Sequence, residues 1–100
     1  MKIDKIYISG KVTGLEKSEY ELNFKRGEEI VRRSGCIPVN PVAICANMVG
    51  ATWIDYMLVC IAALHDCDSI LMLSGWENSK GANIERYIAF QTNKKIIYEI

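Results

Sequence analysis

A carboxylate beside a glycine-containing loop is the strongest indication of chemistry in this chain. Glu85 closes the segment Ser74–Glu85, which follows the apolar run Ser69–Leu73 and opens a helical pattern. Open α/β sheets bind ligands where a strand, a polar loop and a helix start follow one another in this way. Ala82 and Ala89 share a helix face with Glu85 and leave room for a ligand, so the pattern favours a nucleophilic carboxylate. The alternative is a solvated carboxylate that pairs with a cation of its own helix.

Two loops are expected at the same edge of the sheet, because they follow parallel strands. The candidate substrate-binding residues of these loops are Gly10, Lys11, Val12, Thr13, Ser79 and Gly81. The second loop leads into a helix N-terminus with free N–H groups, so Ser79 and Gly81 predict an anion site, and phosphate is the natural candidate. Lys11 would add a positive charge. The alternative is that the glycines only form turns, and Gly10 and Gly14 lack the GxGxxG spacing of a dinucleotide site.

The elements that must position these residues alternate along the chain. Strands are expected at residues 3–9, 36–39, 69–73 and 95–100. Ser18, with Glu21 three residues later, predicts a capping box at the start of the first helix, and Gly35 predicts its end. Thr52 is expected to cap the second helix, and the last helix begins at about Ser79. The apolar face predicted for the helix after Thr52 is Trp53, Met57, Cys60, Ile61 and Leu64.

The order of strands and helices predicts an α/β fold. We expect a three-layer, flavodoxin-like or Rossmann-like domain with a parallel sheet of about four strands and helices on both faces. Pro38 indicates that the second strand is an edge strand or that a strand starts there, and residues 42–50 are expected to form a loop or a short helix. A length of 100 residues predicts a single domain over residues 1–100. Its core is small, so a homo-oligomer is expected.

Composition narrows the classes of partner. The chain has 12 basic residues (lysine plus arginine) and 12 acidic residues (aspartate plus glutamate), so its net charge is near zero. A net charge near zero argues against binding a nucleic acid polymer, which requires a basic surface. The four cysteines form no CxxC pair and His65 is the single histidine, so no metal site is predicted. The sequence has no apolar run of about 20 residues and no secretory h-region, so no membrane association is predicted. We expect a cytoplasmic protein with reduced cysteines.

Several short motifs match one known pattern. The matching residues are Tyr7–Gly10, Thr13–Gly14, Asn23–Phe24, Asn40–Pro41, Trp53, Tyr56–Met57, Cys67–Asp68 and Gly75–Glu85. On these residues the sequence resembles a small nucleoside 2-deoxyribosyltransferase-like domain throughout its length. The last string is the most specific, because larger members share a Ser/Asp-x-Gly-x-x-x-Glu core there.

The resemblance implies a function for two side chains. In that family the glutamate at the position of Glu85 attacks the anomeric carbon of a 2-deoxyribosyl group and expels the base, and another base or water then captures the sugar. This chemistry splits one difficult step into two and requires no cofactor or metal. Tyr7 matches the tyrosine that positions the glutamate. The partner implied is a small-molecule nucleotide or nucleoside.

The residue at position 79 bears on the choice between these substrates. The transferases carry aspartate at the position of Ser79, whereas the 2′-deoxynucleoside 5′-monophosphate N-glycosidases carry a serine that contacts phosphate. A hydroxyl accepts a phosphate neighbour where a carboxylate would repel it, so the resemblance favours a nucleotide monophosphate. Trp76 is expected either to stack on a base or to support its loop from within.

The chain departs from the family pattern at several positions. Cys60 occupies the position of an aspartate that contacts substrate and assists departure of the base, and a thiol is only a weak donor. Asp55 is the nearest substitute, because Asp66 and Asp68 are expected at the opposite edge of the sheet. Thr13 stands where the monophosphate glycosidases carry an arginine. The larger enzymes also complete each site with residues that follow the fourth strand of a neighbouring subunit, a contribution that this sequence, which ends at Ile100, is expected to lack.

Three hypotheses about function therefore remain. The first is an enzyme that acts on the N-glycosidic bond of a 2′-deoxynucleotide or 2′-deoxynucleoside. The second is a non-catalytic nucleotide-binding module of the same fold, which Cys60 favours. The third is a structural α/β domain without a ligand, which a site filled by side chains beside Glu85 would favour.

Overall fold

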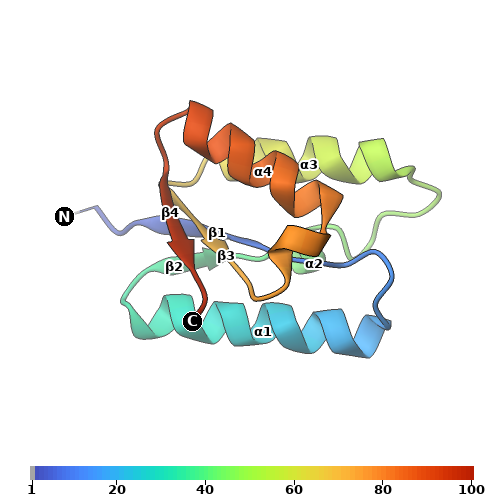
Figure 1. The fold of residues 1–100 in the computed structure, drawn as a ribbon, viewed down its shortest axis with the longest axis horizontal. Helices are drawn as coiled ribbons and strands as arrows, with labels where there is room; N and C mark the ends of the chain where they lie inside the picture. The colour runs from blue at the N-terminus through green and yellow to red at the C-terminus, as the bar shows by residue number, and fades with distance from the viewer. Residues whose placement is uncertain (1) are drawn as a thin grey trace.

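Four parallel strands form the centre of the molecule. The computed structural model describes residues 2–100, and within them the elements are β1 (Lys5–Ser9), α1 (Lys17–Arg33), β2 (Ile37–Val39), α2 (Pro41–Ile44), α3 (Trp53–His65), β3 (Ser69–Met72), a 3-10 turn η1 (Trp76–Asn78), α4 (Lys80–Gln91) and β4 (Lys95–Tyr98). α1 covers one face of the sheet, and α3 and α4 lie together over the other (Figure 1). The predicted three-layer α/β fold with a parallel sheet of about four strands is confirmed.

The order of strands in the sheet creates a crevice at its carboxyl edge. The order is β2-β1-β3-β4, so the chain moves outward from β1 to β2 and then returns to the other side of β1 with β3. The loops after β1 and β3 leave these adjacent strands in opposite directions, so a gap opens between the two loops. Open α/β sheets bind ligands in gaps of this kind. The register pairs Ser9 with Met72, so the loops after β1 and β3 begin at the same level.

Successive side chains of each strand point to opposite faces of the sheet, so the core forms two layers. Tyr7, Ile70 and Met72 face α3 and α4, where they pack with Leu64 and Ala89. The side chains between them face α1, and this second cluster is Ile6, Ile8, Phe24, Val31, Leu71 and Leu73. β1 and β3 are buried along most of their length because each lies between two other strands.

The structure confirms most of the predicted helix boundaries and corrects one. The Thr52 hydroxyl accepts a hydrogen bond from the Asp55 N–H at 3.2 Å, and the Asp55 carboxylate accepts from the Thr52 N–H at 2.8 Å, which completes a capping box. Gly35 follows α1 with φ of +82°, as expected for a helix end. The capping box predicted at Ser18 is wrong, because the N-cap of α1 lies two residues earlier, at Glu16.

A local turn explains the earlier start of α1. The Leu15 N–H donates to the Val12 carbonyl, and the Glu16 carbonyl already accepts the first helical hydrogen bond, from the Tyr20 N–H. Ser18 therefore lies inside the first turn and cannot cap it. The segment predicted as a loop or a short helix contains the short helix α2, which begins at Pro41, with the Asn40 side chain accepting from the Val42 N–H at 3.0 Å.

Candidate functional site

Glu85 is a buried carboxylate that receives two hydrogen bonds from one strand. It lies on α4 and is 5% exposed. The Tyr7 hydroxyl donates to Oε2 at 2.7 Å, and the Ser9 hydroxyl donates to Oε1 at 2.7 Å. Tyr7 and Ser9 alternate along β1, so both side chains point to the face that α4 covers. The carboxylate is thus fixed at both oxygens by the central part of the sheet.

The electrostatic environment of Glu85 comes from burial and from neutral donors. Burial raises the pKa of Glu85 above its ordinary value, and the hydrogen bonds from Ser9 and Tyr7 lower it in part. Burial, with the nearby charge of Glu85, raises the pKa of Tyr7 well above its usual range. Tyr7 therefore keeps its proton and remains a donor. Within residues 2–100 no salt bridge reaches Glu85.

A large cavity lies beside this carboxylate. Its volume is about 1010 Å³, at the upper end of the range for small-molecule sites. Every candidate site residue from the sequence lines it, namely Tyr7, Gly10, Lys11, Val12, Thr13, Ser79, Gly81 and Glu85. The structure therefore brings both loops and the carboxylate together, and their role in binding and catalysis stays a prediction.

The loop between β3 and α4 places a helix N-terminus at this cavity. Gly75 has φ of +89° and begins the 3-10 turn that leads to Ser79. The Ser79 hydroxyl caps α4 by accepting from the Ala82 N–H at 3.1 Å, and its own hydrogen remains available to a ligand. A side chain at Gly81 would meet the Met57 sulfur at 3.1 Å, so packing against α3 also requires a small residue there.

Residues 4–98 match the model of a family described as a domain of unknown function, DUF4406. The chain belongs to the DUF4406 family. No curated protein matches the sequence of this DUF4406 domain. Among residues 2–100, none of the helices combines the length and the apolar character needed to cross a bilayer. The same residues contain no cluster of three side chains of the types that commonly hold a metal ion.

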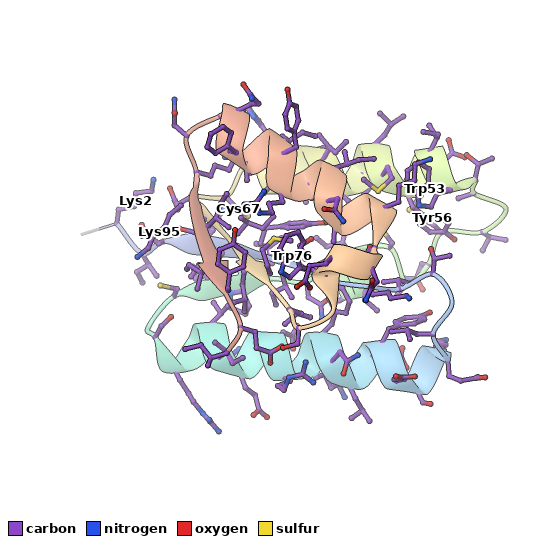
Figure 2. The ribbon with its side chains drawn as sticks, viewed as in Figure 1. Lys2, Trp53, Tyr56, Cys67, Trp76 and Lys95 are labelled. Carbon is purple, nitrogen blue, oxygen red and sulfur yellow. The ribbon has the colours of Figure 1, made fainter. Side chains whose placement is uncertain are left out.

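The two tryptophans of the DUF4406 domain lie in different places, Trp53 in the cavity wall and Trp76 outside it. Trp53 and Tyr56 line the cavity and lie at the end of the molecule opposite to Lys2 and Lys95 (Figure 2). Trp76 lies apart from them. Its ring is 5.8 Å from that of Tyr98 and packs against the core. Trp76 is not part of the cavity wall, an arrangement that favours support of its loop, and stacking on a base stays a prediction.

Cys60 lines the cavity but cannot supply a charge. Its thiol contacts the Tyr7 hydroxyl, and burial raises the pKa of Cys60 to about 12. Asp55 takes part in the capping box and lies outside the cavity wall. Asp68 binds the Lys5 N–H at the start of β1, which confirms its place at the opposite edge.

Sequence reasoning gave no role to several residues that the structure brings to the site. Ser9 is the most important, since its hydroxyl holds Glu85. A serine that ends the apolar run Ile6–Ile8, two positions after Tyr7, is the pattern that could have indicated it. Tyr20 and Phe24, on α1, line the cavity as well. Met48 reaches it from the loop between α2 and α3, which has no distinctive sequence pattern.

Proposed function

We propose that this domain cleaves or transfers the N-glycosidic bond of a 2′-deoxynucleotide, with Glu85 as the nucleophile. The observation that carries the proposal is a buried carboxylate, held at both oxygens, in the wall of a large cavity at the carboxyl edge of a parallel sheet. A carboxylate that is fixed before the substrate arrives needs no reorganisation to attack. The resemblance to nucleoside 2-deoxyribosyltransferase-like domains supplies the reaction class.

The proposed reaction has two steps. In the first, a Glu85 lone pair forms a bond to the anomeric carbon, and the base leaves with the electron pair of the C–N bond and takes a proton from water. In the second, water or an acceptor base forms a bond to the same carbon, and the electron pair of the ester bond returns to Glu85. Tyr7 orients the carboxylate in both steps by its hydrogen bond.

Cations and a helix end support a phosphorylated substrate. Lys11, Lys17 and Lys80 line the cavity, and the α4 N-terminus points its free N–H groups there beside Ser79. The carboxylates in the cavity wall are Glu85 and Glu21. A nucleotide monophosphate would therefore meet more positive than negative charge, which favours it over a nucleoside.

The test is base release from each deoxynucleoside 5′-monophosphate, followed by chromatography. We expect free base with the wild type and none with Glu85→Gln, which keeps the shape but lacks the nucleophile. Glu77→Gln is the matched control, because Glu77 is exposed on the same loop and lies outside the cavity. Intact-mass measurement of the wild type during turnover is expected to show a deoxyribosyl phosphate adduct on the protein.

A non-catalytic nucleotide-binding module is the second candidate, and Cys60 favours it. A thiol with a pKa of about 12 gives no charged partner to the departing base. Thermal stabilisation by nucleotides, without base release from any of them, would establish this function in place of the enzyme. The open cavity beside Glu85 argues against a purely structural domain, for which a filled site was expected.

We also infer that the protein is a cytoplasmic homo-oligomer. α3 and α4 lie side by side (Figure 1) and present Ile54, Leu58, Tyr87 and Phe90, each more than half exposed. Such apolar patches mark protein interfaces. All four cysteines are free thiols, as in a reducing compartment. Light scattering is expected to give a multiple of 11.3 kDa, reduced by Leu58→Glu and unchanged by Leu22→Glu on α1. A monomeric wild type would contradict the oligomer.

A further inference from the structure

Ser9 contacts Glu85 from behind the cavity. It is the last residue of β1, its side chain is fully buried, and it is not part of the cavity wall. Its hydroxyl donates to Oε1 of Glu85, whereas Tyr7, which does line the cavity, donates to Oε2. The two donors therefore distinguish the two carboxylate oxygens. The donor to Oε2 thus lies in the cavity wall, and the donor to Oε1 lies outside it.

We propose that Ser9 is a positioning residue that holds Oε1, leaves Oε2 to attack the sugar, and assists the second step of the reaction. This inference rests on the proposed function. Each carboxylate oxygen has two lone pairs, so one hydrogen bond from Tyr7 leaves a lone pair of Oε2 free for the anomeric carbon. Once that bond forms, Oε1 becomes the carbonyl oxygen of the glycosyl ester, and the Ser9 hydroxyl still donates to it.

The effect of Ser9 differs between the two steps because charge moves in opposite directions. In the first step negative charge leaves the carboxylate, so a donor at Oε1 gives no assistance to the attack. In the second step the ester C–O bond breaks and its electron pair returns to the carboxylate, so the same donor stabilises the charge that develops. The water that attacks gives its proton to solvent. Loss of the hydroxyl should therefore slow breakdown of the intermediate more than its formation.

Kinetics of Ser9→Ala give the first test. We expect kcat to fall roughly 10-fold to 100-fold, as loss of a hydrogen bond to a charged group implies. On the alkaline plateau of each protein's pH–rate profile, where kcat/KM no longer changes with pH, kcat/KM should stay within about 3-fold of the wild type, since it reports the first step. Intact mass should show more glycosyl-enzyme than in the wild type. An equal fall of kcat and kcat/KM, without added intermediate, would overturn the role in the second step.

Matched variants separate this role from a general loss of packing. Ser69→Ala removes the hydroxyl of another buried serine, on β3, that makes no contact with Glu85, and we expect wild-type kinetics. Ser9→Thr retains the hydroxyl and should restore turnover. Ser9→Cys has a weaker donor of similar shape. It should therefore show a smaller fall of kcat and a smaller increase in glycosyl-enzyme than Ser9→Ala. It also replaces the alanine variant if that protein does not fold.

A measurement without substrate distinguishes this inference from the proposed function. The pKa of the Glu85 carboxyl is followed by ¹³C NMR in the ligand-free protein and assigned with Glu85→Gln. Burial already raises that pKa and the Ser9 hydrogen bond lowers it in part, so Ser9→Ala should raise it further. An unchanged pKa would overturn the positioning role whatever the activity. If the pKa of Glu85 rises in Ser9→Ala but the wild type releases no base, Ser9 still positions Glu85. In that case the catalytic step and the proposed function are both wrong.

Discussion

Glu99 connects the end of β4 to α1 and to the loop after β3, and its removal should destabilise the protein in a way that depends on pH. Arg26 on α1 donates to Glu99 through Nε at 2.5 Å and through Nη2 at 3.0 Å. The Ser74 N–H, in the loop that leads to the candidate site, donates to the same carboxylate at 2.8 Å. We therefore expect Glu99→Gln to loosen three segments that are far apart in the sequence.

The magnitude follows from the pKa of this carboxyl. The hydrogen bond from Arg26, first, and that from the Ser74 N–H lower the pKa of Glu99 from 4.5 to about 2. A shift of that size corresponds to about 3 kcal/mol in the free energy of unfolding. The Arg26 side chain is 45% exposed, so solvent screens the pair and we expect about 2 kcal/mol at pH 7. This stabilisation is complete above pH 4.5 and is lost as the pH falls toward 2.

Urea unfolding, followed by tryptophan fluorescence, measures the difference between the two proteins. At pH 7 the variant should be less stable by about 2 kcal/mol, and at pH 3 the difference should be roughly half of that or less. Glu29→Gln is the control. Glu29 and Arg33 form an exposed pair on α1 at 3.7 Å, for which we expect at most about 0.5 kcal/mol. Equal losses in both variants, or a difference for Glu99→Gln that does not change with pH, would refute the reasoning.

Three further predictions test local features of the fold. Thr52→Ala should lower the free energy of unfolding by about 1 kcal/mol in urea titrations, because the cap of α3 is lost. Ser18→Ala should change the free energy of unfolding by less than about 0.5 kcal/mol. A larger loss of stability in Ser18→Ala than in Thr52→Ala would restore the cap predicted at Ser18. Gly27→Ala should destabilise by about 1 kcal/mol in the same assay, because the new Cβ would lie 2.9 Å from Ile8, and overpacking outweighs the gain in helix propensity; a stabilised variant would contradict this contact. Burial raises the pKa of Cys60 to about 12. At pH 8 its thiol should therefore react with iodoacetamide at least roughly 100-fold more slowly than a cysteine in an unstructured peptide, as measured by mass spectrometry. Comparable rates would show that the thiol is not buried as described.

The sequence alone was sufficient for the class of fold and for the neighbourhood of the candidate site. Alternating apolar runs, the Thr52 cap and the glycine at position 35 are local features, and local features specify elements and their order. Parallel strands joined by helices place their following loops at one edge. For this reason Glu85 and the residues around Gly10 and Ser79 could be assigned to a common site before the structure was known.

Contacts between distant parts of the chain were decided only by the tertiary structure. The hydrogen bonds of Tyr7 and Ser9 to Glu85 span 78 and 76 residues, and they form because β1 lies in the middle of the sheet with α4 across its face. The position of Trp76 against Tyr98 likewise depends on β4 pairing with β3. Residue type and spacing do not encode strand order or register, because these depend on how all the apolar faces are buried together. The sequence thus indicated a carboxylate at a sheet edge, and packing determined which hydroxyl holds each of its oxygens.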